Sequence, residues 1–265
     1  ETLEQQAAAA GKAGAGPKIF ASTRPPAAED ESVGQALAAA DEARAACYLV
    51  HLSTAGAVRQ IRDARAAGLA NVYGEVCVHH LLLDESYYGK PDADRYLVCP
   101  PLRTAEDSEA LWDGLANGTI ATIGSDHCQA KTSTGEWLAS VGHQHAYGLA
   151  GIGPRLPLLL SAAMAGRLTL PQVVSLAAEN PARAFGHYPR KGALLPGSDA
   201  DVVIFDPAGE TVVPSDGFGD GTGDSVYGGM TLQGRIRAVL LRGRLIVADD
   251  ELTDGQRTGT YLAAG

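Results

Sequence analysis

The sequence predicts an α/β fold in which helices cover a parallel sheet, followed by a smaller segment rich in strands. In the first part of the chain, short apolar runs almost free of charge alternate with helical patterns. This alternation is typical of parallel strands that are buried on both faces. The pattern becomes helical after about residue 156, and strand and turn signals replace it from residue 192 onward.

The elements of the first part follow from local composition and spacing. An Ala-rich stretch with acidic residues predicts a helix at 30–46, and apolar residues in helical spacing predict another at 54–67. The remaining expected elements of this part are a helix at 105–115 and strands at 47–50, 71–76, 96–99 and 120–123. In α/β folds, residues with chemical roles gather where such strands end.

The second part is expected to begin with helices and to end in a small sheet. Helical patterns cover 156–165 and 170–178, with a short helix after Asn180-Pro181. A turn at Gly197–Asp201 precedes an apolar strand at 202–205. Two further strands, 238–241 and 244–247, flank Arg242-Gly243 and read as a β-hairpin.

Composition excludes several classes of partner. The chain has 265 residues and a formal net charge of −10, which argues against nucleic-acid binding through clustered Lys and Arg. No apolar run reaches the roughly 18 residues that a membrane span needs. The four cysteines form no CxxC pair, and the first residues show no signal-peptide pattern. We therefore expect a cytoplasmic protein with reduced thiols, no membrane segment and no nucleic-acid partner.

Three apolar strands end in residue types that bind metals, namely His51, His79 and Asp126. In a parallel barrel such positions converge on one mouth. A single His in this place is more often a structural residue, and an Asp is often the N-cap of the next helix. It is the coincidence of the three that predicts a metal site within this set.

Several adjoining segments resemble, in order and spacing, the signature of the dihydropyrimidinase, hydantoinase and allantoinase group. They are Arg24-Pro25-Pro26, Val50-His51-Leu52-Ser53, Glu75-Val76-Cys77-Val78-His79, Pro100-Pro101-Leu102-Arg103, Gly124-Ser125-Asp126-His127-Cys128, Asn180-Pro181-Ala182, Phe185-Gly186, Lys191-Gly192 and Gly197-Ser198-Asp199-Ala200-Asp201. The resemblance implies a (β/α)8 TIM barrel of the amidohydrolase kind with a small β-sandwich domain. Residues 1–190 would supply roughly the last strands of the barrel, and residues 191–265 a sandwich segment and tail.

The resemblance also implies a centre of two divalent ions, usually zinc. Its ligands are a His-x-His pair, a carboxylated Lys that bridges both ions, two later His residues and an Asp. His51 matches the second of these later His residues, and Asp126 matches the Asp that binds metal and moves the proton. The other ligands would lie upstream of Glu1, in an N-terminal part that this sequence does not contain. His79 falls where the family often has Gln or a non-ligand His, so its metal role is set aside.

The implied reaction is metal-dependent hydrolysis of the amide bond of a cyclic amide or imide, of the dihydropyrimidine or hydantoin type. The two cations would activate a water, and Asp126 would pass its proton to the leaving ring nitrogen. Cys99 and Tyr147 match substrate-binding positions, where the family usually has Ser and Asn. Val78, His80 and Gln129 replace a usual Pro, Tyr and Pro. These departures leave the ring specificity open.

Two alternatives remain at this point. One is another ring specificity, as in allantoinase or dihydroorotase. The other is a non-catalytic scaffold similar to the dihydropyrimidinase-related proteins, against which the retention of His51 and Asp126 argues. The family also implies a homo-oligomer, a tetramer or a dimer. We expect structural roles, and not metal binding or catalysis, for the remaining residues considered: His127, His187, Trp112, and the His143-x-His145 pair on a Gly-rich loop.

Overall fold

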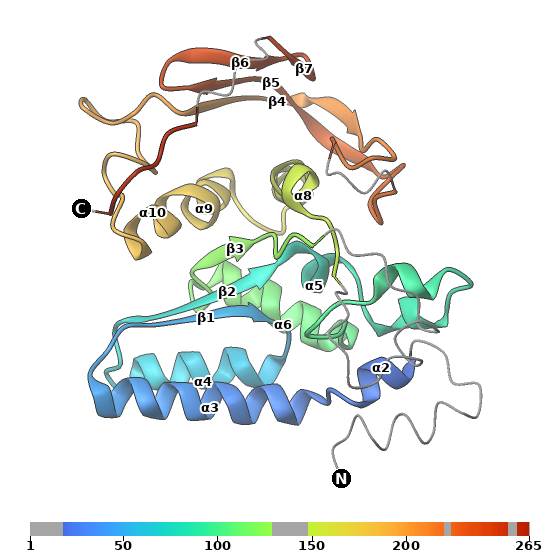
Figure 1. The fold of residues 1–265 in the computed structure, drawn as a ribbon, viewed down its shortest axis with the longest axis vertical. Coiled ribbons are helices and arrows are strands. Elements are labelled where there is room, and N and C mark those ends of the chain that lie inside the picture. The colour runs from blue at the N-terminus through green and yellow to red at the C-terminus, as the bar shows by residue number, and fades with distance from the viewer. Residues whose placement is uncertain (1–17, 129–147, 220–223, 254–258, 265) are drawn as a thin grey trace. The chain divides into compact units, whose positions relative to one another are not determined.

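The computed structural model describes residues 18–128, 148–219, 224–253 and 259–264 (Figure 1). The chain divides into two compact units, each described by itself below. The first comprises Glu1–Gly153 and Pro214–Gly228, and the second comprises Pro154–Val213 and Gly229–Gly265. Among the described helices, none combines the length and the apolar character that crossing a membrane requires.

The first unit is built on a parallel sheet of three strands in the order β1-β2-β3. The strands are β1 (Cys47–Leu52), β2 (Val72–Cys77) and β3 (Thr122–Gly124). The helices α3 (Pro26–Ala43), α4 (Ala55–Ala66) and α6 (Ala105–Ala116) alternate with them in sequence. Figure 1 shows α3 and α4 running together along one face of the sheet. The predicted alternation of strands and helices is confirmed, whereas the described residues form an open sheet and no closed barrel.

Hydrogen bonds between side chains join all three strands. The Tyr48 hydroxyl of β1 donates to the Glu75 carboxylate of β2 at 2.8 Å. The same hydroxyl lies 2.7 Å from the Thr122 hydroxyl of β3. Burial raises the pKa of Tyr48 well above its usual value, and this is the main cause of its shift. The phenol therefore stays protonated and can keep donating to Glu75.

The connection between β2 and α6 differs from its prediction. It contains α5 (Val78–Leu82), the 3-10 helices η1 (Glu85–Gly89) and η2 (Ala93–Tyr96), and then extended chain. The strand predicted at 96–99 is wrong: Leu97 and Val98 are buried but pair with no strand among the described residues. The following residues, Pro100 and Pro101, lack the N–H groups that a sheet ladder needs. The apolar run therefore reflects burial of a connection and not a strand.

The second unit combines helices with an antiparallel sheet. The helices are α8 (Ile152–Met164, whose first two residues belong to the first unit), α9 (Leu170–Val174), the π-helical turn η3 (Ser175–Glu179) and α10 (Asn180–Ala184). The sheet has the order β4-β5-β6-β7 and consists of β4 (Val202–Val212), β5 (Thr231–Leu241), β6 (Arg244–Ala248) and β7 (Glu251–Leu252). The sequence predicts a barrel part at 1–190 and a sandwich segment at 191–265. This division concerns the complete protein and stays a prediction.

The predicted hairpin at Arg242-Gly243 is confirmed. Leu241 pairs with Arg244 across it, and both turn residues have positive φ angles, 50° and 78°. Two consecutive positive φ angles define the turn class whose twist matches that of antiparallel strands. Strands β4 and β5 extend well beyond the stretches predicted for them, because their outer ends carry polar and glycine residues that hide the strand pattern.

The segment before β4 is organised by Lys191. Its ammonium group contacts the Asp199 carboxylate at 2.9 Å and also pairs with Asp201. The next residue, Gly192, has a φ of 75°, and a Cβ there would lie 2.8 Å from the Ala178 carbonyl oxygen. Only glycine satisfies both the left-handed backbone and the close approach of the helix.

We predict that Gly192→Ala lowers the free energy of unfolding by about 2–3 kcal/mol, since backbone strain and overpacking add. Chemical denaturation of the purified protein measures this loss. Gly166→Ala is the matched control, because Gly166 has a φ of 82° and nothing within 4 Å of its added Cβ. The control carries backbone strain alone and should cost only about 1 kcal/mol. Equal losses in the two variants would show that the close approach at Gly192 has no energetic weight.

Candidate functional site

His51 lies at a distortion of β1. The pairing of β1 with β2 shifts between Leu49 and Leu52, because Leu49 pairs with Gly74 while Leu52 pairs with Val76. One extra residue is thus accommodated on β1, as in a β-bulge, and His51 has a φ of 41°. Bulges and left-handed non-glycine residues are uncommon, and both occur preferentially at functional sites. The distortion leaves the His51 side chain half-buried instead of packed in the core.

Asp126 follows β3 and adopts a similar backbone conformation, with a φ of 42°. Its side chain is exposed, beyond the carboxyl end of the strand. The neighbouring His127 accepts hydrogen bonds at Nδ1 from the backbone N–H groups of Gly151 and Ile152, at 3.2 and 3.4 Å. These bonds agree with the structural interpretation of His127, since its side chain anchors the segment that carries Asp126.

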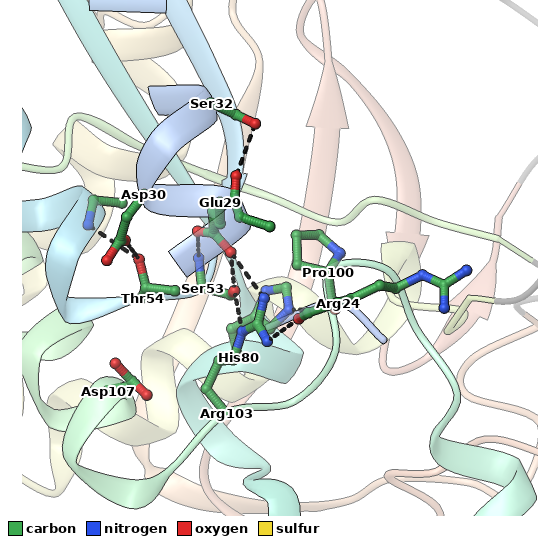
Figure 2. Close-up of polar contacts among 12 residues, drawn as sticks. Arg24, Glu29, Asp30, Ser32, Ser53, Thr54, His80, Pro100, Arg103 and Asp107 are labelled. Atoms are coloured by element: carbon green, nitrogen blue, oxygen red, sulfur yellow. Dashed lines mark hydrogen bonds and ion pairs between the residues drawn. The ribbon is translucent and has the colours of Figure 1, made fainter. Parts of the chain in front are cut away.

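Charged side chains from two helices hold the residues that follow His51 (Figure 2). Glu29 of α3 accepts hydrogen bonds from the Ser53 backbone N–H at 2.7 Å and from the Ser53 hydroxyl. Asp30 accepts a bond from the Thr54 hydroxyl at 2.6 Å. Asp107 of α6 accepts one from the Ala55 N–H at 2.9 Å. Consequently the three residues from Ser53 to Ala55 are tied to both α3 and α6, which restrains the end of β1.

Arg103 completes this network. Its guanidinium donates to the Ser53 hydroxyl at 3.0 Å, to the Arg24 carbonyl oxygen at 2.6 Å and to the Glu29 carboxylate at 3.4 Å. The side chains of Arg103 and Glu29 are 6% and 11% exposed, so the ion pair is almost removed from water. Three segments of the family signature, far apart in sequence, therefore meet at one buried cation (Figure 2).

Of the two residues predicted to bind substrate, Cys99 is described and Tyr147 lies outside the described residues. Cys99 is exposed as a residue, yet partial desolvation of its thiol raises its pKa, and the positive charges of Arg24 and Arg103 oppose this effect. The Asp126 carboxylate raises the same pKa further, so the two side chains lie within electrostatic range. The Cys99 thiol therefore stays protonated near neutral pH, within electrostatic range of the Asp126 carboxylate.

A second group of metal-ligand types lies at the end of β2. The ligand atoms of Cys77, His79 and His80 are within 4.8 Å of one another, and all three residues are buried. Burial lowers the pKa of His79 well below its usual value, and the nearby His80 and His51 lower it further. Burial also lowers the pKa of His80 to about 3, against a hydrogen bond to the Pro100 carbonyl oxygen that raises it. Both rings are therefore neutral at pH 7, and His51 lies within electrostatic range of them.

Sequence reasoning considered His79 and set it aside, and it did not combine Cys77 and His80 with it. A signal was present, since Cys77-Val78-His79-His80 lies at the end of an apolar strand and brings three metal-ligand residues within four positions. Pattern alone could not show that the helical turn α5 folds all three side chains toward one point. The buried bonds of Glu29 and Arg103 to Ser53 also went unrecognised, because their partners are 24 and 50 residues away.

The residue types present suit part of a metal centre. Imidazole and carboxylate groups are ligands of zinc and related divalent ions, and His51 and Asp126 belong to the ends of strands in one parallel sheet. Their accessible side chains can reach an ion or a substrate, whereas the network around Ser53 keeps the supporting backbone rigid. Two ligands are too few to hold a pair of ions, so the complete centre requires further ligands.

Comparison with known proteins agrees with this arrangement. The model of the amidohydrolase family matches residues 13–246. Relatives include the D-hydantoinase of Geobacillus stearothermophilus, 36% identical over 255 residues, and that of Rhizobium radiobacter, 35% identical over 259 residues. These matches cover 93% and 94% of this chain and 53% of each relative. The chain therefore spans about half the length of the curated relatives that it matches.

Solved structures give the same result. The dihydropyrimidinase of Brevibacillus agri superposes with a TM-score of 0.86 at 35% identity, and the D-hydantoinase of Bacillus sp. AR9 with a TM-score of 0.87 at 37% identity. Each match covers 95% of this chain and 55% of the solved chain. The α/β unit and the antiparallel sheet thus correspond to part of a larger known fold.

Proposed function

Because the chain belongs to the amidohydrolase family, we propose that the complete protein hydrolyses the amide bond of a cyclic amide or imide of the dihydropyrimidine or hydantoin type. The observation that carries this proposal is the paired placement of His51 and Asp126. Each has a left-handed backbone conformation at the carboxyl end of a strand of one parallel sheet. The names of the relatives, D-hydantoinase and dihydropyrimidinase, support the choice of ring.

In this proposal His51 and Asp126 are ligands of a centre of two divalent ions, with Zn²⁺ as the ion that suits them. When bound, the ions supply water activation and polarisation of the amide carbonyl. The remaining ligands would be a His-x-His pair, a bridging carboxylated Lys and one further His, from a part of the protein not contained in this sequence. The network of Glu29 and Arg103 keeps Ser53 in place and thereby orients His51.

The other residues would handle the proton and the ring. Asp126 would accept a proton from the attacking water and pass it to the leaving ring nitrogen. Cys99 would face the substrate with a neutral thiol, which suits an uncharged ring. Tyr147 would contribute a second contact to the ring. We further propose that the protein is a cytoplasmic homo-oligomer, a tetramer or a dimer. We also propose that it binds no nucleic acid, and the net charge of −10 supports this last point.

We predict that His51→Asn in the purified complete protein lowers the bound metal by about one ion per subunit, because three or four ligands hold each such ion. Turnover of dihydrouracil should fall with it, and elemental analysis and a ring-opening assay on one sample measure both. His187→Asn, a change in the second unit, is the control and should retain metal and turnover. If His51→Asn keeps the full metal content and rate, the ligand assignment and the proposed function that rests on it fail together.

A further inference from the structure

The end of β2 contains a buried group of side chains for which the proposed reaction has no use. Cys77 is the last residue of β2, and His79 and His80 lie in α5. Cys77 and His79 are 0% exposed and His80 is 2% exposed. Among the residues that the structure describes, this is the one group of three or more potential metal-ligand residues whose ligand atoms lie within 4.8 Å of one another.

Hydrogen bonding determines which His80 nitrogen can bind a metal. Nε2 lies 3.0 Å from the Pro100 carbonyl oxygen. A carbonyl oxygen only accepts, so Nε2 carries the proton and Nδ1 carries the lone pair. That Nδ1 is buried and has no hydrogen-bond partner. A histidine that donates one N–H to a backbone carbonyl and presents its other nitrogen is the usual arrangement of a metal ligand.

His79 is less satisfied still. Both of its ring nitrogens are buried without a hydrogen-bond partner, although its ring packs against that of His80 at 4.3 Å between centroids. Leaving a buried polar group unpaired costs about 1–3 kcal/mol. A metal ion bonded to the lone pair of this ring would offset that cost. Neither His51 nor Asp126 supplies a hydrogen bond to it.

We propose that Cys77, His79 and His80 bind one divalent transition-metal ion, with Zn²⁺ as the best match. A thiolate and two imidazoles are the ligand types that favour zinc over Mg²⁺ or Ca²⁺. A tetrahedral zinc ion holds such ligand atoms about 3.3–3.7 Å apart. Small side-chain rotations bring atoms within 4.8 Å of one another to that spacing. On binding, the Cys77 thiol releases its proton to solvent, and the sulfur–metal bond replaces the sulfur–hydrogen bond.

The backbone that carries the ligands has the rigidity that a metal site needs. The Ser108 hydroxyl of α6 donates to the His80 carbonyl oxygen at 2.9 Å. The Trp112 indole N–H donates to the Leu81 carbonyl oxygen at 3.0 Å. Two side chains of α6 therefore hold the short helix α5, which carries both histidines, against α6. The site uses neither His51 nor Asp126, so it does not depend on the proposed function.

Cobalt substitution of the purified complete protein tests this proposal. A thiolate bound to Co²⁺ gives a charge-transfer absorption in the near ultraviolet, which ligands with nitrogen and oxygen atoms alone do not give. The centre proposed for hydrolysis has no cysteine ligand, so this absorption reports the Cys77 site alone. We expect it to develop with about one Co²⁺ per chain and to disappear in Cys77→Ser. Cys47→Ser is the matched control, since Cys47 is a half-buried thiol at the start of β1. This variant should retain the absorption.

His79→Gln and His80→Tyr keep the Cys77 thiol and place residues typical of the family in the core. Each should weaken Co²⁺ binding at this site at least about tenfold, because changing even a hydrogen-bond partner of a metal ligand costs about that much affinity. These variants decide the question if Cys77→Ser fails to fold. Any of three results would overturn the proposal. The wild-type protein could lack the charge-transfer absorption, or Cys77→Ser could retain it. Both histidine variants could also bind Co²⁺ with an unchanged absorption and affinity. Loss of hydrolysis with the absorption retained would instead count against the proposed function alone.

Discussion

In the complete protein, Asp126→Asn should lower turnover of dihydrouracil or hydantoin by about 10²-fold or more, as expected for the loss of a general base. Asparagine keeps the shape of the side chain and one ligand oxygen, but it cannot accept the proton. Because Asp126 is exposed at the end of β3 and carries no structural hydrogen bond in the network around Ser53, the variant should fold normally. The rate constant is measured at saturating substrate, with metal content determined on the same sample.

Asp113→Asn is the control for this variant. Asp113 is an exposed residue of α6, so the same chemical change there should leave the rate near that of the wild-type protein. A near-normal rate for Asp126→Asn with metal bound would refute its role in proton transfer. A low rate accompanied by loss of metal would mean that Asp126 acts as a ligand only.

The second large effect concerns the buried ion pair. Arg103→Met should lower the free energy of unfolding by about 3–5 kcal/mol, since removing one partner leaves the other charge buried and uncompensated. Glu29 is 11% exposed and would lose its cationic partner, while the Arg24 carbonyl and the Ser53 hydroxyl would lose a donor. Urea denaturation followed by circular dichroism measures the loss.

Two further variants give this prediction its control. Arg62→Met breaks the exposed pair with Asp63, whose side chains are 59% and 67% exposed, and should cost less than about 1 kcal/mol. Adding Glu29→Gln to Arg103→Met removes the uncompensated charge and should recover part of the stability. If Glu29→Gln lowers the stability of Arg103→Met as much as it lowers that of the wild-type protein, the buried unpaired Glu29 charge is not what destabilises Arg103→Met.

The regular part of the fold could be predicted from the sequence because its signals are local. Apolar runs at 47–50, 71–76 and 120–123, almost free of charge, lie within or overlap β1, β2 and β3, and the Arg242-Gly243 turn predicted the hairpin. The apolar run at 96–99 gave a wrong strand, because burial of a connection and burial of a strand leave the same composition. Periodicity reports which residues avoid water and not what they pair with.

The sequence predicted only those residues of the candidate site that lie at the end of a strand. His51 and Asp126 could be identified as residues at strand ends, and the resemblance to a family supplied their roles. The buried network could not be found in this way, since Glu29, Ser53 and Arg103 have no sequence spacing that links them. The same holds for the cluster at Cys77, where only the geometry of α5 brings the ligand atoms together. Tyr147 lies outside the described residues, and its role stays a prediction.

The reach of Arg103 along the chain has a consequence for the order of folding. Its guanidinium joins residue 24 to residue 103, across 79 positions, and residue 53 to residue 103, across 50. Because closing long loops costs chain entropy before the contact is gained, we expect these contacts to form after the local helices and turns. The end of β1 is therefore held in its final geometry only once α3 and α6 have docked. A misfolded or half-assembled unit would present His51 without its rigid support, and the ability to hold a ligand there would emerge only in the last step of folding.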